Sequence, residues 1–533
     1  MNIYLIGMII SLVVYVLIGF VISRTVKNAE DYYVAGRRAP VFLISGSMIA
    51  SYCSTGLFMG DAGQAYIGAF VPLIIVTTMQ VGGYLFGAVF FGRYLRRSKA
   101  LTIPEFFGRR FNSGAIRILA TITAIVTMTV YLLSVIQGIG TLMTAVTGLD
   151  YKWCLIIAMV VFTTVTVVGG SSGVLITDTL MATIFTIALL IAVFSISNNT
   201  GGWFDSIASL ASNPATTNFL SWAGEPGSLF ESGGMNMIWA FVNGIVWFSV
   251  CMVGPWQSSR YLMAKNEHTV VRSSFISALG IFLLEILVGL VAVMINIVNP
   301  DIVAQTGSAS NVMIWAAMNI MPKILGVILL TGVLAAGISS ATTFLSLIGS
   351  SFANDILKKE GKSAINVGRI TMIVVSLIVL GIALLNSPSI YWVMIFGGSL
   401  VGSTWMPVAL ASVLSKRITK KGAFWGMLAG FIACVAIKFF STFSGISLPA
   451  YLDPSLIGMV CNVIAMVIAD RFSRVTEEEI LFRQKMFIVP DEEKDPVEVR
   501  KTLRATKWSF LIGVFAIIFM LVLWVIPYLR AKI

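Results

Sequence analysis

Long stretches of uncharged apolar residues recur along the whole chain and constrain its fold more than any other feature. A stretch of about 20 such residues spans the roughly 30 Å hydrocarbon core of a bilayer as an α-helix. In lipid, every backbone polar group must be satisfied within the protein, so repeated spans of this kind form helices. We therefore predict an all-α polytopic membrane protein with about fourteen transmembrane helices, at residues 3–23, 42–70, 72–92, 115–146, 152–168, 174–198, 236–259, 273–299, 324–352, 370–386, 390–415, 422–441, 454–470 and 508–529.

The composition supports the same class. Hydrophobic residues make up 57% of the chain and charged residues only 11%, whereas soluble domains carry about 25% charged residues. A formal charge of +12 would suggest a nucleic-acid partner in a soluble protein. When the chain is threaded from an outside N-terminus, however, the basic residues gather in cytoplasmic loops, and the exceptions among the 36 are Lys152, Lys323, Lys438, Arg530 and Lys532. The charge is a topology signal, so we predict an outside N-terminus, a plasma (inner) membrane location and no nucleic-acid partner.

The first apolar run and the scarcity of metal-binding residues exclude further classes of protein. No basic residue precedes residues 3–23, whereas a cleavable signal peptide has a basic flank there, so this run is predicted to remain as an anchor. The five cysteines stand singly, and the chain has one histidine, His268. Zinc, iron–sulfur and haem sites therefore lack ligands. With no nucleophile–base pair or phosphate loop either, we expect a protein that is not an enzyme and carries no organic cofactor.

Three carboxylates fall inside predicted membrane spans: Asp61, Asp178 and Glu285. A charge in hydrocarbon is costly, so each is a functional candidate. Glu285 lies in an otherwise apolar helix, and for it we favour a protonated or interhelically hydrogen-bonded structural role over a role in substrate binding.

The decapeptide 334–343 concentrates small residues and hydroxyls. Ala336, Ser339, Ser340 and Thr343 stand at i, i+3, i+4 and i+7, which places them on one helical face. Close helix packing through small residues is the alternative interpretation, but four hydroxyls in the five residues 339–343 exceed what packing needs. Uncharged oxygens are the ligands that a hard cation such as sodium prefers.

Two apolar runs are interrupted by polar and small residues, at 49–63 and at 247–257. Irregular backbone at membrane depth survives only where it faces protein or a water-filled cavity, and its freed carbonyls can then hold a cation. Two interrupted helices five segments apart are typical of an inverted repeat with a binding site at the membrane midplane.

These residues resemble the sodium/solute symporter family, whose members have the leucine-transporter fold of two inverted five-helix repeats. The resemblance covers roughly residues 30–440. It implies a sodium-coupled secondary active symporter that imports a small organic solute by alternating access. It rests on short stretches in a fixed order: Ala50-Ser51 through Gly60 and Gly63–Tyr66, Ile103–Phe106 with Arg110-Phe111, Gly169-Gly170 with Thr177-Asp178, Arg260–Lys265, Ala335-Ala336 with Ser339-Ser340 and Asp355, and Gly422-Ala423 with Gly426-Met427 and Gly430.

The resemblance implies two sets of sodium ligands. The shared site of the family would use the backbone carbonyls of Ala50, Cys53 and Ala336 and the hydroxyls of Ser339 and Ser340. A second sodium, held by some members, would be bound by Asp178, Ser339, Thr342 and Thr343. All four positions of the second set carry an oxygen, so coupling to two sodium ions is implied.

The resemblance also implies a substrate pocket, lined by Tyr52, Ser54, Thr77, Gln80, Trp247, Val250, Cys251 and the stretch Phe396 to Ser399. None of these positions carries Arg or Lys, so an anionic substrate would be met by hydroxyls, amides, helix ends or a bound sodium. Tyr52 replaces the Asp or Asn often found in the family, and Asp61 and Gln64 depart from its usual Leu-Pro-Gly-Ala. The runs 396–407 and 253–255 look closest to the pantothenate and monocarboxylate branch.

The predicted organisation follows from these assignments. It consists of an N-terminal peripheral helix and loop (1–41), a first repeat (42–198), an extracellular loop (199–235), a second repeat (236–415), two peripheral helices (416–470), a charged cytoplasmic segment (471–507) and a last helix (508–533). The expected partners are a small-molecule substrate, sodium and the lipid bilayer. Two alternatives stay open: a proton-coupled or uncoupled carrier in which Asp178 or Asp61 titrates, and a transporter-like sensor whose segment 471–507 reports occupancy to a partner.

Overall fold

The computed structural model describes residues 2–23, 29–385 and 390–532. Within these ranges the regular secondary structure is helical, and the one strand-like feature is an isolated bridge between Ala39 and Ala264. Eleven of the described helices are long and apolar enough to cross a membrane, and three shorter apolar helices lie at 3–18, 41–52 and 151–167. The prediction of an all-α multi-pass membrane protein is confirmed.

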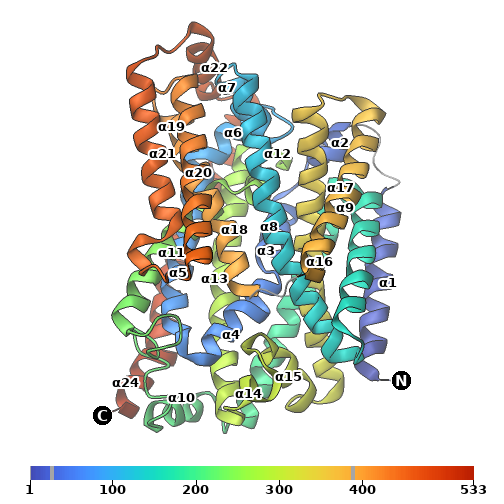
Figure 1. Cartoon of the computed structure of the whole chain (residues 1–533), viewed down its shortest axis with the longest axis vertical. Helices are drawn as coiled ribbons and strands as arrows, with labels where there is room; N and C mark the ends of the chain where they lie inside the picture. Colours follow the sequence, from blue (N-terminus) through green and yellow to red (C-terminus); the bar gives the residue numbers. More distant parts are fainter. Residues whose placement is uncertain (1, 24–28, 386–389, 533) are drawn as a thin grey trace.

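The helices run mostly along the long axis of the molecule (Figure 1). The central ones are α3 (Val41–Tyr52), α5 (Phe70–Gly87), α8 (Gly114–Thr147), α9 (Tyr151–Asn199), α11 (Gly233–Val253), α12 (Pro255–Met263), α13 (Glu267–Val298), α16 (Lys323–Ser351), α17 (Gly361–Leu385) and α18 (Ile390–Thr404). The peripheral ones are α1 (Ile3–Ser23), α20 (Lys420–Ser444), α21 (Pro454–Arg471) and α23 (Pro496–Met520). Both ends of the chain lie at the same end of the molecule in Figure 1. The total of fourteen stays a prediction.

Shorter helices cap the two ends of the bundle. At the end that holds the termini lie α10 (Trp203–Ser212), α14 (Ile302–Thr306), α15 (Val312–Asn319) and α24 (Ile526–Lys532). At the opposite end lie α2 (Ala29–Val34), α6 (Arg93–Arg97), α7 (Ile103–Arg110) and α22 (Glu477–Phe487). A further short helix, α19 (Met406–Leu414), follows α18.

Both predicted interruptions are breaks in the helical backbone. Helix α3 ends at Tyr52, and Cys53 leaves helical geometry with φ −69° and ψ 89°. The backbone between α11 and α12 is extended at Gly254, with φ −55° and ψ 139°. This second break follows from the sequence, because Pro255 disfavours the α conformation in the residue before it and supplies no backbone N–H.

A third change of direction separates the first two predicted core segments. After the break in α3 the chain continues through the π-helical turns Gly56–Asp61 and Ala65–Ala69, which flank α4 (Ala62–Gln64). Gly68 then adopts φ +102° before α5 begins. Only glycine enters this region at little cost, and a Cβ at Gly68 would also lie 2.5 Å from Glu225 Cβ.

One helical element, α9, takes the place of the two predicted helices 152–168 and 174–198. The side chains of the predicted loop Gly169–Gly173 lie outside the described residues. The two parts of α9 contact different neighbours: Thr163 Oγ1 donates to Ser376 Oγ of α17 (2.8 Å), whereas Thr179 Oγ1 donates to the carbonyl of Leu43 in α3 (3.2 Å).

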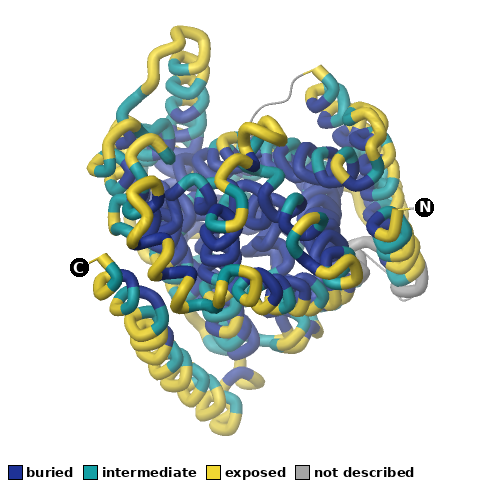
Figure 2. Tube along the Cα trace, turned by 90° about the horizontal axis from the view of Figure 1, so that it is seen from below, coloured by how far each residue is buried: buried dark blue, intermediate teal, exposed yellow. Residues whose placement is uncertain are grey.

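The protein core lies along α16 and the helices around it. Every residue of α16 from Leu329 to Leu345 is buried. In Figure 2 the central tubes are dark blue, whereas the C-terminal helix projects from the body and is largely yellow. Of α23, Ala516 alone is buried, although most of its second half is apolar. An exposed apolar surface of this kind is what a lipid environment solvates.

The charged segment 471–507 contains helical structure. Thr476 and Glu479 form a capping box that starts α22, and the last long helix, α23, begins at Pro496 rather than near residue 508. The segment docks on the end of the bundle: Arg97 Nη1 donates to the carbonyl of Met486 (3.0 Å), and His268 Nε2 lies 2.9 Å from the carbonyl oxygen of Glu493. The Ser/Thr-x-x-Glu capping pattern was readable in the sequence, but the docking partners are distant in the chain.

Candidate functional site

The break in α3 leaves backbone carbonyls without helical partners. The last regular bond of α3 runs from Cys53 N to Ile49 O (2.8 Å), and helical bonding resumes where Leu57 N donates to Ser54 O (3.2 Å). The last four carbonyls of a helix have no intrahelical partner. Ala50 and Cys53, which supply the predicted carbonyl ligands, lie in this stretch, and α3 packs against α16.

The hydroxyl face of α16 is fully enclosed in protein. Ser339, Ser340, Thr342 and Thr343 are each at most 2% exposed. Ser340 Oγ has no hydrogen-bond partner among the described residues, whereas Thr342 Oγ1 donates to the carbonyl of Ser339 (3.0 Å). A buried polar group without a partner requires an explanation.

Asp178 is the centre of a buried network that joins four helices. Its Oδ2 lies 2.8 Å from Arg260 Nη2 and accepts a hydrogen bond from Ser47 Oγ (2.6 Å), and its Oδ1 accepts one from Ser339 Oγ (2.6 Å). Arg260 also donates to Thr343 Oγ1 (2.8 Å). The network connects α3, α9, α12 and α16, and three of the four predicted second-sodium positions belong to it.

The predicted substrate residues Tyr52 and Gln80 meet Glu285. The Tyr52 hydroxyl lies 2.7 Å from Gln80 Oε1 and 2.6 Å from Glu285 Oε1, so its single proton serves one of these acceptors at a time. Gln80 Nε2 donates to the same Glu285 oxygen (3.3 Å). The Tyr52 ring packs edge-on against Trp247, with centroids 5.6 Å apart. The predicted interhelical hydrogen bonding of Glu285 is observed, and it joins this residue directly to the predicted pocket.

Asp61 and Glu285 line one small cavity, together with Phe70, Leu73, Ile74, Thr77 and Gly289. Asp61 is partly buried and Glu285 is 9% exposed. Neither carboxylate forms an ion pair within the described part of the chain.

The remaining predicted substrate positions differ in their contacts. Ser54 and Val250 face the same region: Ser54 Oγ lies 3.4 Å from the hydroxyl of Tyr131, and a Cβ at Gly398 would contact Val250 and Trp247. Buried Cys251 packs opposite α5, where a Cβ at Gly83 would lie 3.0 Å from it. The hydroxyls of Thr77 and Ser399 donate to the carbonyls of Leu73 and Ile395 in their own helices. Phe396 lies apart from this region, with its ring under Lys438 Nζ at 5.9 Å.

Three neighbours of the site were not predicted from the sequence as site residues. Arg260 entered the sequence analysis only as part of a family motif. Tyr131 stacks on Trp256 with ring centroids 5.2 Å apart. Gln257 is fully buried, and both polar atoms of its amide lack a partner among the described residues. Its position two residues after Pro255, within the second predicted interruption, could have indicated it from the sequence.

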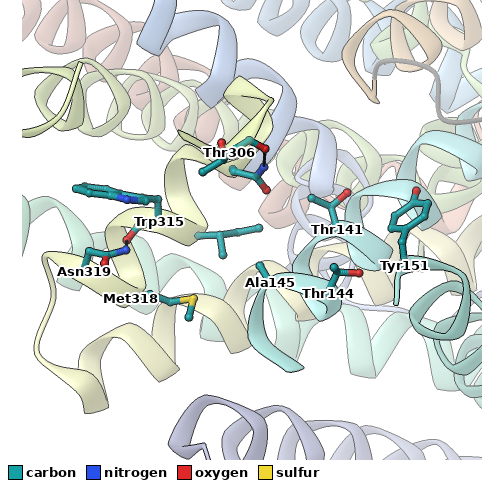
Figure 3. A pocket seen from close by; sticks show the side chains of 10 residues that line it. Thr141, Thr144, Ala145, Tyr151, Thr306, Trp315, Met318 and Asn319 are labelled. Atoms are coloured by element: carbon teal, nitrogen blue, oxygen red, sulfur yellow. Dashed lines mark hydrogen bonds between the residues drawn. The ribbon is translucent and has the colours of Figure 1, made fainter. Parts of the chain in front are cut away.

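A separate pocket of about 350 Å³ lies at the end of the molecule that holds the termini (Figure 3). It is formed by α8, the start of α9 and the connection that contains α14 and α15. In Figure 3, Thr141, Thr144 and Tyr151 line one side, and Trp315 and Asn319 line the other. None of the predicted site residues lines it.

Comparisons with known proteins agree with this architecture. A model of the sodium:solute symporter family matches residues 32–430. The sodium/proline symporter of Escherichia coli (strain K12) is 26% identical over 456 residues, which cover 82% of this chain and 87% of that protein. The sodium/glucose cotransporter of Vibrio parahaemolyticus is 24% identical over 561 aligned positions, which cover 95% and 94% of the two chains.

The fold has a counterpart among solved structures. A Na⁺-coupled sialic acid symporter in a substrate-bound outward-open state superposes with a TM-score of 0.75 at 18% identity, covering 90% of this chain and 99% of that one. The family match spans both broken helices, the Asp178 network and the hydroxyl face of α16. The chain therefore belongs to the sodium:solute symporter family, and it is a sodium-coupled symporter with the leucine-transporter fold.

Proposed function

We propose that the protein imports a small organic solute by alternating access and that a sodium ion binds between the broken end of α3 and the hydroxyl face of α16. Its ligands are the carbonyls of Ala50, Cys53 and Ala336 and the hydroxyls of Ser339 and Ser340. The observation that carries this proposal is the buried, unpartnered hydroxyl of Ser340. A site shared by two helices is complete only while they lie together, so bound sodium favours the conformation in which they do.

A second cation site at Asp178 extends this proposal. Asp178, Ser339, Thr342 and Thr343 offer oxygens that suit sodium, but the Asp178 carboxylate here meets the Arg260 guanidinium at 2.8 Å. A ligand alters a conformational equilibrium only through its differential affinity for the two states. We therefore infer that a second sodium binds in a state in which Arg260 has moved away from Asp178.

We propose that the N-terminus is outside and that the protein resides in the plasma (inner) membrane. The end of the bundle opposite the termini carries the basic helices α6 and α7, with Arg93, Arg96 and Arg97 on the first and Arg109 and Arg110 on the second. Basic loops favour the cytoplasmic side. A reporter enzyme that is active only outside the cytoplasm is expected to be active when it is fused after residue 533. Activity of a reporter that works only in the cytoplasm would show the opposite orientation.

Ser340→Ala is expected to raise the half-saturating sodium concentration for uptake several-fold. The substitution deletes one of five proposed ligands while leaving an apolar residue of similar size in a helix. Expression and unfolding temperature should stay close to wild type, because Ser340 Oγ has no hydrogen-bond partner among the residues that the structure describes. Uptake measured against sodium concentration in proteoliposomes tests this expectation.

The matched control is Ser350→Ala in the same helix. Ser350 is also buried, but its hydroxyl donates to the carbonyl of Leu347 (3.0 Å). Removal of this hydroxyl is expected to leave the dependence of uptake on sodium concentration unchanged. If Ser340→Ala keeps the wild-type half-saturating sodium concentration, the assignment of the first sodium site is wrong.

A further inference from the structure

Two carboxylates share a cavity in the membrane core without a basic partner. The free volume between Asp61, Thr77, Glu285 and their neighbours is about 10 Å³, which accommodates one water-sized group. Two negative charges at this depth are strongly unfavourable unless a proton or another positive group is bound between or beside them.

Glu285 is positioned to receive such a group. Both hydrogen bonds that it accepts, from Tyr52 and from Gln80, end on Oε1. Its Oε2 accepts none from the described residues, although the side chain is only 9% exposed. One oxygen is therefore held in place by the predicted substrate residues, whereas the other accepts no hydrogen bond from the described residues, and Glu285 itself lines the cavity.

Helix α13 approaches Phe70 closely beside this cavity. A Cβ at Gly289 would lie 2.6 Å from the Phe70 ring, so any larger residue at this position would displace that ring. Phe70 presents an aromatic surface, and Tyr52 with Trp247 supplies two more on the side of the predicted pocket. Carboxylates combined with aromatic faces are the environment in which proteins bind ammonium groups.

We propose that Asp61 and Glu285 bind a positively charged nitrogen of the transported solute. An ammonium group is close to a water molecule in size, and the rest of the solute lies toward Tyr52, Gln80 and Trp247. The substrates are thus amines or zwitterions, in contrast to the simple carboxylates suggested by the resemblance to the monocarboxylate branch. This inference rests on the proposed function, because it assumes that the Tyr52 region holds the solute.

The test uses the purified full-length protein in detergent and measures its unfolding temperature with and without sodium. The probes are pairs that differ in nitrogen against carbon: L-proline with cyclopentanecarboxylate, L-alanine with isobutyrate, and ethanolamine with 1-propanol. In sodium, at least one nitrogen-containing member is expected to raise the unfolding temperature while its carbon counterpart does not. If no such member acts, or if the carbon counterpart acts equally, the proposal is overturned.

Variants locate the effect at the two carboxylates. Glu285→Gln and Asp61→Asn are expected to weaken binding of the active probe at least about tenfold, and Glu285→Asp should restore part of it. The control Ser273→Ala lies in the same helix, and its hydroxyl donates to the carbonyl of Thr269 (2.7 Å), so it should bind the probe as the wild type does.

The measurements with sodium alone distinguish failure of this proposal from failure of the proposed function. Sodium alone is expected to stabilise the wild type, Glu285→Gln and Asp61→Asn equally. If Glu285→Gln loses this effect, the pair is a sodium site and the assignment to the solute is wrong. Absence of a sodium effect in the wild type would contradict the proposed function instead.

Discussion

Asp178→Asn is expected to destabilise the protein by about 3–5 kcal/mol, because removal of one member of a buried ion pair leaves the other charge uncompensated. Arg260 is 1% exposed and Asp178 is fully buried. The asparagine keeps the shape of the side chain but removes the charge that faces the guanidinium at 2.8 Å. A lowered unfolding temperature and a reduced yield of folded protein in the membrane would show the effect.

The double variant Asp178→Asn/Arg260→Gln distinguishes a charge effect from a packing effect. It removes both charges, so its stability should recover much of the loss, with a large coupling energy in the double-mutant cycle. If the second sodium also binds at Asp178, the sodium dependence of the double variant should change from sigmoidal to hyperbolic. An Asp178→Asn protein as stable as the wild type would mean that this ion pair does not hold the helices together.

A partly exposed ion pair provides the matched comparison. Arg272 and Glu498 pair with side chains 17% and 25% exposed, and pairs near solvent contribute about 0–1 kcal/mol. Glu498→Gln is therefore expected to change the unfolding temperature much less than Asp178→Asn does.

Gly83→Ala is expected to abolish transport and to destabilise the protein by about 1–3 kcal/mol or more, as overpacking of a tight interface does. A Cβ at this position would overlap the carbonyl oxygen of Phe248 and lie 2.9 Å from its carbonyl carbon. A backbone group cannot rotate away as a flexible side chain does, so α5 and α11 must separate. Gln80 lies one turn before Gly83, and Trp247 precedes Phe248, so the predicted pocket would deform. Uptake and unfolding temperature measure the two effects.

The neighbouring glycine serves as the control for this substitution. A Cβ at Gly82 would lie 3.4 Å from the Phe248 ring, an ordinary contact with a side chain. Gly82→Ala is therefore expected to fold and transport nearly as the wild type does. Equal effects of the two substitutions would show that loss of glycine as such, and not the approach of the helices at Gly83, is responsible.

Much of the fold was predictable because membrane helices are encoded locally. Uncharged runs long enough to cross the bilayer gave the all-α class, and Gly254-Pro255 gave the second break through the conformational restriction before proline. The spacing of hydroxyls from Ser339 to Thr343 predicted the hydroxyl face of α16. The boundaries of α9 and α23 were missed, because regular backbone there continues through polar residues.

The pairings within the site were not predictable, because they depend on how distant helices pack. Asp178 and Arg260 are 82 residues apart, and Tyr52 and Glu285 are 233 residues apart. An aspartate in an apolar run indicates that another group compensates its negative charge. The sequence of its own segment does not reveal whether that group is a bound cation or an arginine. The same limit applied to Glu285: its structural and substrate-binding interpretations differ only in what lies across the helix interface.

The hydrogen bonds of Glu285 also bear on how this chain enters the membrane during synthesis. A charged residue at the centre of a membrane helix costs about 2.5–3.5 kcal/mol on insertion. Both donors to Glu285 precede it in the chain, Tyr52 by 233 residues and Gln80 by 205. The segments that carry Tyr52 and Gln80 have therefore left the ribosome before α13 emerges, so the carboxylate can find its partners while the remainder of the protein is still being made.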